Sequence, residues 1–410
     1  MLLVTEALVL LCCCCAAADS VFNSVDQKRY IVLSADRLGF ANRIRSVADW
    51  HAIAVLSGRT LIVSWTATAD CNAAFTDLFQ AGPERLKVLP FVLPAGEVGL
   101  HAVTEMAEEA SLTSIILRKD NMFVPNTSGF VVSRDLLTSN VSVLVTDYVG
   151  VVTLEGLGSC VHYLRTHSAF LRSLVPTEFI RDFVKKVMSE YFSDGRMMIG
   201  VHARFHDPLQ DWAVVPPLHS ASSSSSSPSE AVTFGVGATL EHFADYMRQI
   251  EAKMGGAERV RFFIASNDAG SKDQLLAQFP DAVSLNGEQR RSERAGIVFA
   301  TIEWLLLSES SLILHTHGSS FGVEAAQVHQ RPLAGIYDGS VLHTYSVYHP
   351  YCGHLLYLKT FSSQGTPETY LESLSSDGTV IRNVSGKQVS LAPCEALDQF
   401  GLAAYCIQSD

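Results

Sequence analysis

The chain has 410 residues, of which 48% are hydrophobic and 18% are charged, and its formal net charge at pH 7 is −12. The length predicts two domains, and the composition is that of a globular protein rather than a disordered chain. An acidic chain without a basic run excludes nucleic acid as the expected partner, so an anionic ligand has to be met by a local group of Arg or Lys residues.

The first 18 residues predict a secretory signal peptide. An apolar stretch from Ala7 to Cys15 precedes three alanines, Ala16 to Ala18, which are the small residues typical of a cleavage site. We therefore expect the protein in the lumen of the secretory pathway, in the endoplasmic reticulum or Golgi, or secreted. Any association with a membrane would run through this segment, and the alternative is that it stays uncleaved as an anchor.

Sequons and cysteines fit the same compartment. Sequons for N-glycosylation, in the pattern Asn-x-Ser, begin at Asn126, Asn140 and Asn383. In an oxidising lumen some cysteines should pair. The candidates for fixing the C-terminal tail are Cys352, Cys394 and Cys406, and their pairing is left open by the sequence.

The first half of the chain alternates strands and helices from residue 30 onward. The pattern begins with a strand, a loop, a helix and a second strand, which is the opening of a Rossmann-like layer. The expected elements are strands at 30–33, 60–65, 87–92, 114–117 and 143–148, a helix at about 41–57, and a helical stretch at 169–191 that is interrupted near Pro176 and links the two halves.

The second half, residues 197–336, predicts another Rossmann-like domain. The expected strands are 197–201, 260–266, 282–285, 311–315 and 332–336, and the expected helices are about 240–254, 271–279, 296–307 and the stretch ending at 328. A serine run lies within 218–231, and we expect a disordered surface loop there. Residues 345–410 show no clear period, and we interpret them as a tail that covers the core.

Polar residues follow the first strand of this second half, in the run MMIGVHARFHD from Met197 to Asp207. Ligands of open α/β sheets collect at the carboxyl ends of strands, and strand alternation places His202 and Arg204 on one side of the chain. A guanidinium is a permanently charged, planar fork of donors, which suits a phosphate or a departing pyrophosphate. The alternative is that Arg204 only pairs with Asp207 or Asp211.

Two further segments follow strands that should end at the same edge. Asn267 and Asp268 follow one strand, and Gly318, Ser319 and Ser320 follow another. A glycine turn that opens a helix aims free backbone N–H groups at one point, where a phosphate can bind. The alternative is that Asp268 and the two serines only cap the helices behind them. The three segments together predict a site for a nucleotide diphosphate.

These motifs resemble those of the fucosyltransferase superfamily, which includes α1,6-fucosyltransferases and protein O-fucosyltransferases. The similar stretches are GVHARFHD at 200–207 (the H-x-R motif), 261–268, 303–321, and the loop 39–43 with its glycine and Asn. Together they cover most of residues 30–336. Phe205 stands where α1,6-type enzymes carry a second Arg, so the single-Arg form is closer to the protein O-fucosyltransferases.

The resemblance implies an α/β fold of the GT-B class, with two Rossmann-like domains facing a cleft. The implied domains are an acceptor domain at 28–172, a domain that binds the GDP-sugar at 173–345, and a tail at 346–410 that packs on the core. The implied reaction is the inverting, metal-independent transfer of fucose from GDP-fucose, the donor substrate, to a glycan or protein hydroxyl. No cofactor is implied, and the sequence has no Asp-x-Asp pair for a divalent ion.

The resemblance also implies roles for particular residues. Arg204 would hold the β-phosphate as the principal catalytic group, and His202 would lie near the guanosine. The remaining donor contacts would come from Asp268 at the guanine or ribose, from Ser319, Ser320 and Phe321 at the pyrophosphate turn, and from Asn42 and Arg43 at the fucose and phosphate. Asp36, in the loop after the first strand, is the candidate base, and its alternative is a solvated loop carboxylate.

Two other classes of function stay open from the sequence. A serine hydrolase is the first, because residues 318–322 match G-x-S-x-G with Ser320 as nucleophile, and Asp338 and His343 follow in the α/β-hydrolase order. A catalytically inactive glycan-binding relative is the second, since a fold does not fix an activity.

Overall fold

A computed structural model describes part of the chain. The described residues are 29–36, 38–89, 93, 97–117, 130–132, 135, 137, 139–147, 152–154, 160–205, 214–215, 232–233, 238–287, 290–316, 319–337, 340–345, 358–361, 367–370, 372–374 and 380–382. The expectations for the signal peptide, the serine-rich loop, Asn126, Asn383 and the C-terminal cysteines fall outside these residues.

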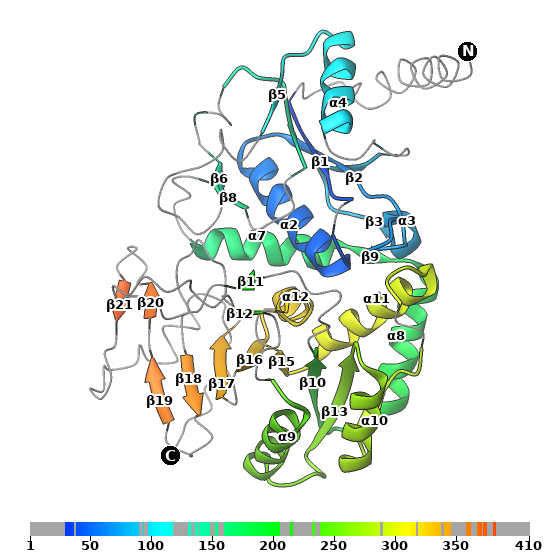
Figure 1. Cartoon of the computed structure of the whole chain (residues 1–410), viewed down its shortest axis with the longest axis vertical. Helices are drawn as coiled ribbons and strands as arrows, with labels where there is room; N and C mark the ends of the chain where they lie inside the picture. The colour runs from blue at the N-terminus through cyan, green and yellow to red at the C-terminus, as the bar shows by residue number, and fades with distance from the viewer. Residues whose placement is uncertain are drawn as a thin grey trace. The chain divides into compact units, whose positions relative to one another are not determined.

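The chain divides into two compact units, drawn mainly in blue to cyan and in green to orange in Figure 1. Unit 1 comprises Met1–Ile180, Glu288–Thr301 and Pro350–Cys352, and unit 2 comprises Arg181–Gly287, Ile302–His349 and Gly353–Asp410. Each unit contains a parallel sheet with helices, so the predicted α/β class and the two Rossmann-like layers are confirmed. That the two units face a cleft, as a GT-B fold requires, stays a prediction.

Unit 1 is built on a five-stranded sheet with the order β4-β2-β1-β7-β5, and each described pairing in it is parallel. Its strands are β1 (Tyr30–Ser34), β2 (Thr60–Ser64), β4 (Leu86–Val88), β5 (Ser114–Ile116) and β7 (Val143–Thr146). The central strands β1, β2 and β7 are buried at every position. Continuous apolar runs of this kind are typical of strands covered on both faces.

Helices and short strands complete unit 1. The helices are α2 (Phe40–Leu56), α3 (Phe75–Leu78), α4 (Glu97–Glu109), α7 (Cys160–Ser173) and the start of α8 (Glu178–Tyr191). The short strands are β3 (Phe79–Ala81) paired with β9 (Val175–Pro176), and β6 (Phe130–Val132) paired with β8 (Val152–Leu154). Helix α2 follows directly on the loop after β1, and Gly58, at φ 67°, turns the chain back into β2.

Unit 2 is built on an eight-stranded sheet with the order β14-β13-β10-β15-β16-β17-β18-β19. The strands are β10 (Met197–Ala203), β13 (Val260–Ser266), β14 (Val283–Ser284), β15 (Leu312–Thr316), β16 (Pro332–Tyr337), β17 (Ser340–Tyr345), β18 (Leu358–Phe361) and β19 (Pro367–Tyr370). The first five are parallel and follow the order 3-2-1-4-5 when they are numbered along the chain. The strand order therefore reverses between β10 and β15, which is the point where such sheets bind ligands.

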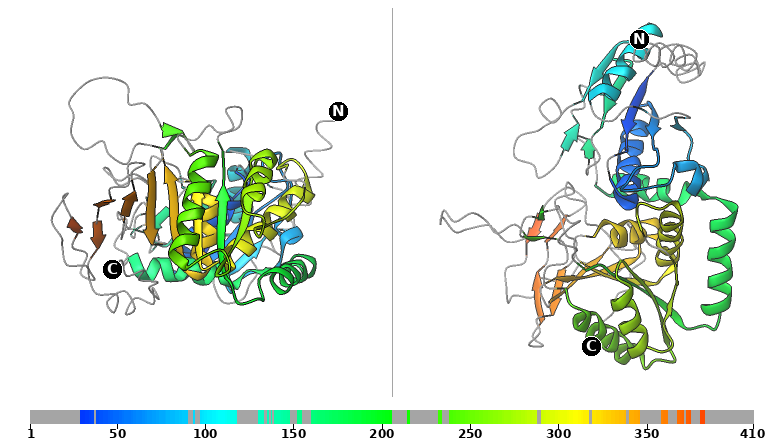
Figure 2. Two further views of the ribbon diagram at one scale, coloured as in Figure 1. Left: turned by 90° about the horizontal axis from the view of Figure 1, so that it is seen from below. Right: turned by 45° about the vertical axis from the view of Figure 1, so that its right-hand side comes forward.

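Strands also occur beyond β16, in part within residues 346–410, where the sequence shows no clear period. Strands β17, β18 and β19 are antiparallel and continue the sheet beyond β16, as the orange strands in Figure 2 show. Two small antiparallel pairs also occur. They are β11 (Val214–Val215) with β12 (Val232–Thr233), and β20 (Glu372–Leu374) with β21 (Val380–Arg382). Four-residue strands such as LKTF and PETY carry too short an alternation to stand out from loop sequence.

The helices of unit 2 pack on the parallel strands (Figure 1). They are α9 (Leu240–Met254), α10 (Ala269–Gln278), α11 (Arg294–Glu309, whose first turns belong to unit 1) and α12 (Ser320–His329). Alternate β10 residues Ile199, Val201 and Ala203 join the core cluster that includes Phe243 and Met247 of α9.

Helix α11 covers the opposite face of β10. A Cβ added at Gly200 would lie 2.8 Å from Oγ of Ser310 and 2.9 Å from Cδ2 of Leu307, so a larger residue would require these side chains to shift. By alternation His202 lies on the same face as Gly200, toward α11 and α12. This close packing therefore sets the distance between β10 and the end of α11.

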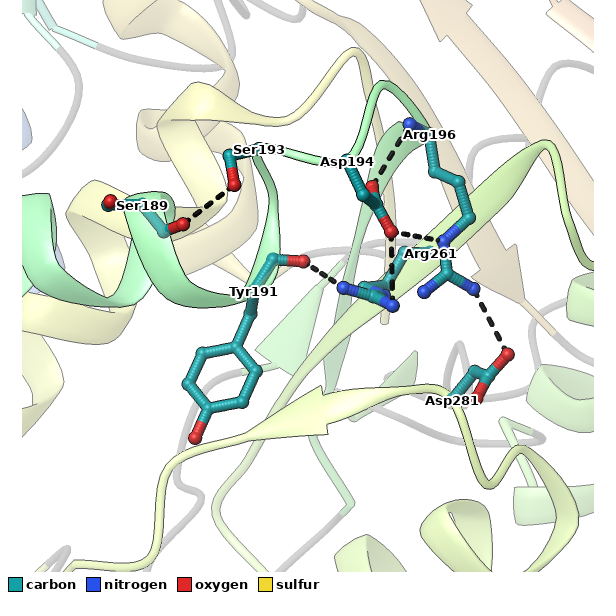
Figure 3. Close-up of polar contacts among 7 residues, drawn as sticks. All are labelled: Ser189, Tyr191, Ser193, Asp194, Arg196, Arg261 and Asp281. Atoms are coloured by element: carbon teal, nitrogen blue, oxygen red, sulfur yellow. Dashed lines mark hydrogen bonds and ion pairs between the residues drawn. The ribbon is translucent and has the colours of Figure 1, made fainter.

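The amino ends of β10 and β13 are joined by a network of charges, shown in Figure 3. Asp194 accepts from Nε of Arg196 at 2.7 Å and pairs with Nη2 of Arg261 at 3.1 Å. Arg196 also pairs with Asp281 at 3.0 Å, and Arg261 donates to the carbonyl of Tyr191 at the end of α8. Hydrogen bonds from Arg196 lower the pKa of the Asp194 carboxyl. Arg261 belongs to the second resembling motif, yet it lies at the opposite end of β13 from Asp268.

No helix in the described ranges combines the length and the apolar character that are needed to cross a bilayer.

Candidate functional site

His202 is the last-but-one residue of β10 and is 6% exposed. Its ring stacks on that of Phe321, with centroids 4.8 Å apart and planes 28° apart. Its Nδ1 is buried and has no hydrogen-bond partner. Burial, with a smaller effect of the Arg204 charge, lowers the pKa of the imidazole from 6.5 to about 3, so the ring is neutral at physiological pH.

Arg204 and Phe205 leave the strand and are held by side chains from both neighbouring strands. The hydroxyl of Thr316, at the end of β15, accepts from the Arg204 N–H at 2.8 Å and donates to the Arg204 carbonyl at 2.8 Å. The amide of Asn267, at the end of β13, accepts from the Phe205 N–H at 3.1 Å and donates to the Phe205 carbonyl at 3.3 Å. Arg204 thus sits at the carboxyl edge, as the sequence predicts.

Ser319 and Ser320 open α12 beside this segment. Ser319 is the N-cap residue, it is 0% exposed, and its N–H donates to the Thr316 carbonyl at 3.1 Å. Its side chain makes no capping bond, and its Oγ is buried without a partner. The hydroxyl of Ser319 therefore gives no support to the alternative that this side chain only caps the helix. Ser320 is the first residue of the helix and is 8% exposed.

Asp268 lies at the end of β13 and serves as a helix cap. One of its carboxylate oxygens, Oδ2, accepts from the Ser271 N–H at 2.6 Å at the start of α10. Its own N–H donates to the Ser266 hydroxyl at 3.1 Å. The capping alternative is thus realised for this residue, and a contact of the exposed carboxylate with a ligand stays a prediction.

Arg43 of unit 1 differs from its expected orientation. The guanidinium is 0% exposed, because α2 holds it beneath the loop after β1. Its donors go to the carbonyls of Leu38 (2.6 Å), Thr66 (2.6 Å) and Asp36 (2.8 Å) and to the hydroxyl of Thr68 (2.6 Å). Burial lowers the pKa of this guanidinium. The geometry corrects the expectation that Arg43 faces a ligand and makes it an anchor of two loops.

Asp36 is engaged in the same loops. Its Oδ1 accepts from the N–H of Thr66 at 2.7 Å and from the hydroxyl of Thr66 at 2.8 Å. Its Oδ2 accepts from the hydroxyls of Ser64 at 2.9 Å and Ser34 at 3.4 Å. A carboxylate has about four lone-pair sites, and these four hydrogen bonds occupy them. The arrangement therefore favours a role for Asp36 in anchoring the loops. The assignment of Asp36 as the base stays a prediction.

Asn42 lies in the first turn of α2 and is partly exposed. Its Oδ1 accepts from Nη2 of Arg45 at 2.6 Å, and its carbonyl accepts from the Ser46 hydroxyl at 2.8 Å. The structure thus gathers His202, Arg204, Ser319, Ser320 and Phe321 at one edge of unit 2. Asp36, Asn42 and Arg43 belong to unit 1, where Asp36 and Arg43 share their loop contacts.

Sequence reasoning missed several residues that shape this edge. The strand expected at 311–315 stops one residue before Thr316, whose hydroxyl is the contact that holds the Arg204 backbone. Lys272 and Glu303 form a buried ion pair at 3.0 Å, and Lys272 also donates to the carbonyl of Leu285 at 3.0 Å. A lysine in an amphipathic helix gives no signal of burial. By contrast, the position of Glu303 next to Trp304 in an apolar helix is a sequence signal that this carboxylate is buried.

Two further observations concern metals and thiols. Among the described residues, no group of three or more His, Cys, Asp or Glu side chains is arranged to hold a metal ion. Cys71 is a buried free thiol in unit 1, and burial raises its pKa. It is therefore a poor nucleophile at neutral pH.

Solved fucosyltransferases match the chain in a structural comparison. The fucosyltransferase NodZ from Bradyrhizobium is 16% identical, with 78% of this chain and 99% of NodZ covered and a TM-score of 0.47. A FUT1 variant from Arabidopsis thaliana in complex with GDP is 14% identical, with coverages of 78% and 73% and a TM-score of 0.47. POFUT1 in complex with GDP is 12% identical, with coverages of 75% and 96% and a TM-score of 0.45. No family model and no curated protein matches the sequence.

Proposed function

We propose that the chain is a glycosyltransferase of the GT-B class that transfers fucose from GDP-fucose to a hydroxyl of a glycan or protein. One observation carries the proposal. His202, Arg204 and the N-terminus of α12 gather where the strand order of a 3-2-1-4-5 parallel sheet reverses, and such sheets bind ligands there. The choice of GDP-fucose follows the motif resemblance, and GDP or GDP-fucose is named for several of the solved fucosyltransferases.

The residues at this edge supply the chemistry that a diphosphate needs. A helix N-terminus presents unsatisfied N–H groups and a partial positive charge, and α12 offers both next to Arg204. The Ser319 hydroxyl, buried and without a partner, is available to donate to a phosphate oxygen. Ser320 and Phe321 would line the same turn, with neutral His202 stacked on Phe321 beside the guanosine. The exposed Asp268 would accept from the guanine or ribose.

The proposed reaction is a single displacement with inversion. The acceptor oxygen attacks C1 of fucose from the face opposite GDP, the C1–O bond to the β-phosphate breaks, and GDP leaves with the electron pair. The acceptor proton passes to a base, for which Asp36 stays the proposal. A fixed guanidinium at Arg204 stabilises the negative charge that develops on the β-phosphate, and this role requires no metal. Unit 1, through Asn42 and the loops that Arg43 anchors, would meet the fucose.

We place this activity in the lumen of the secretory pathway. Support comes from the apolar N-terminal segment with its alanines and from the sequons, of which Asn140 lies in an exposed bend of unit 1. The acceptor domain, the GDP-sugar domain and the tail are proposed with the boundaries given by the motifs.

Calorimetric titration of the mature chain with GDP, together with turnover of GDP-fucose on an acceptor panel, tests the proposal. Arg204→Lys should lower turnover by about 100- to 1000-fold, because the ammonium lacks the planar fork. Its melting temperature should stay within about 2 °C of the unaltered chain. The matched control is Arg248→Lys, an exposed arginine of α9, which should turn over normally. Unfolding of Arg204→Lys, or normal turnover by it, would contradict the proposal.

The same experiments separate the other two classes. GDP binding without turnover on any acceptor would support a catalytically inactive glycan-binding relative. Labelling of Ser320 by a fluorophosphonate would support a serine hydrolase. Ser320 is buried, and Asp338 of that triad lies outside the described residues, so no observation favours the hydrolase here.

A further inference from the structure

The segment that carries Arg204 continues β10 beyond its last paired residue. The parallel register ends with Ala203 opposite Ser266 on one side and with His202 opposite His315 on the other. Backbone hydrogen bonding to the neighbouring strands stops there. The next two residues keep all four of their backbone polar groups paired, but with side chains, so the strand is in effect extended by two residues.

Thr316 supplies half of these bonds. A threonine hydroxyl has one donor and two acceptor sites, and Thr316 uses one of each on the N–H and carbonyl of Arg204, both at 2.8 Å. The side chain is 1% exposed and β-branched, so its χ1 is restricted. Its carbonyl accepts from the Ser319 N–H at 3.1 Å. Thr316 therefore links the Arg204 backbone to the start of α12.

Asn267 supplies the other half from the opposite side. Its amide pairs with both backbone groups of Phe205, at 3.1 and 3.3 Å. Two separate strands thus hold two consecutive residues, and the Cα of Arg204 is fixed between them. Thr316 contacts Arg204 itself, and Asn267 contacts the residue after it.

We infer that Thr316 is a positioning residue for Arg204, and this inference rests on the proposed function of Arg204 at the β-phosphate. A guanidinium that acts on a leaving group has to be placed closely, since a displacement of about 1 Å can cost on the order of 100-fold in rate. The hydroxyl of Thr316 fixes the main chain from which that side chain projects, and it joins this main chain to the helix whose N-terminus meets the same phosphate. Asn267 supports the same segment.

Thr316→Val tests the inference, because valine keeps the shape and removes both hydrogen bonds. We expect Thr316→Val to lower kcat by about 10- to 100-fold, while Thr316→Ser, which keeps the hydroxyl, stays within about 3-fold. The matched control is Thr301→Val, another fully buried threonine, whose hydroxyl donates to the Ile297 carbonyl inside α11. It should turn over normally. Equal losses in Thr316→Val and Thr301→Val would overturn the inference.

Nucleotide affinity provides a readout that general destabilisation does not move. Guanosine monophosphate lacks the β-phosphate, so the ratio of its Kd to that of GDP reports the β-phosphate contact alone. Thr316→Val should reduce this ratio by about 10-fold, whereas Thr316→Ser and Thr301→Val should leave it unchanged. A variant that weakens both nucleotides equally would show a merely structural role and refute the inference.

Hydrogen exchange keeps the test independent of the proposed function. Exchange at the Arg204 and Phe205 amides should be slow in the unaltered chain and at least 10-fold faster at Arg204 in Thr316→Val. If the unaltered chain binds no GDP but this acceleration is seen, the proposed function fails, whereas the hydrogen bonds of Thr316 to the Arg204 backbone are supported. If exchange at Arg204 does not respond to Thr316→Val, Thr316 does not hold the Arg204 backbone and the inference fails whatever the activity.

Discussion

Acidification should destabilise unit 2 through His202, and replacement of this histidine by phenylalanine should reduce that sensitivity. The ring is 6% exposed, its Nδ1 has no partner, and burial with the nearby Arg204 charge lowers its pKa to about 3. The same histidine titrates near 6.5 in the unfolded chain. Between these two values the unfolded state binds a proton that the folded state does not, so stability falls as the pH falls from 6.5 toward 3.

The size of the effect follows from the two pKa values. At about 1.36 kcal/mol per pH unit, His202 alone should remove roughly 2 kcal/mol by pH 5 and roughly 4–5 kcal/mol by pH 3. For a unit of about 200 residues, 2 kcal/mol corresponds to a decrease of about 4–8 °C in the melting temperature. Phenylalanine at the same position keeps the stacking on Phe321 and cannot be protonated, so His202→Phe should lose less stability over the same range.

Scanning calorimetry between pH 7 and pH 5 measures this difference. The unaltered chain and His202→Phe should diverge as the pH falls, by about 4–8 °C at pH 5. His101→Phe, which removes an exposed histidine of α4, is the control and should follow the unaltered chain. If His202→Phe and the unaltered chain decline in parallel, the imidazole does not carry a depressed pKa and the reasoning is refuted.

Three other predictions follow from buried or modified positions. Arg43→Lys should lower the free energy of unfolding by about 3–5 kcal/mol, because one ammonium cannot replace four guanidinium hydrogen bonds. Thermal denaturation measures this loss. An unchanged melting temperature together with weaker GDP binding would instead place Arg43 in the ligand site. Lys272→Met should cost about 3–5 kcal/mol in urea unfolding, because it removes the buried ammonium that pairs with the Glu303 carboxylate, and adding Glu303→Leu should recover most of the loss. A double variant no more stable than Lys272→Met would contradict this. Asn140→Gln, expressed in secreting eukaryotic cells, should lose the mass of one N-glycan, and an unmodified Asn140 in the unaltered protein would contradict the assigned compartment.

The parallel strands and several helices could be predicted because their signals are local. Helix α9 spans Leu240–Met254 as the sequence predicts, since Thr239 caps its start and Gly255, at φ 91°, ends it. Strand β13 likewise matches its apolar run at 260–266. The antiparallel strands β18 and β19 were missed because LKTF and PETY lack the continuous apolar runs that mark the buried parallel strands. Their stability comes from pairing with the sheet rather than from their own sequence.

The candidate site could be predicted only in part, for a similar reason. The rule that ligands collect at strand carboxyl ends identifies Arg204 and Ser319 from local patterns. The contacts that fix these residues join distant positions: Thr316 is 112 residues from Arg204, and Arg43 reaches Thr68 across 25 residues. The sequence shows that an arginine is present. The carbonyls that it contacts depend on the packing of loops that are distant in the sequence, and no local pattern predicts that packing.

If the proposed diphosphate site is correct, the charges at the carboxyl edge of β10 account for its reliance on a single arginine. A protonated His202 two residues away would repel Arg204 and would have to be charged inside a nearly dry environment, which its depressed pKa prevents. The imidazole therefore remains neutral and contributes an apolar, stacked surface against Phe321. Positive potential for a diphosphate then comes from the Arg204 guanidinium and from the N-terminus of α12, both held by Thr316. Because a guanidinium stays charged and a helix dipole does not titrate, the proposed site should keep its attraction for a diphosphate across the range in which His202 would ordinarily change charge.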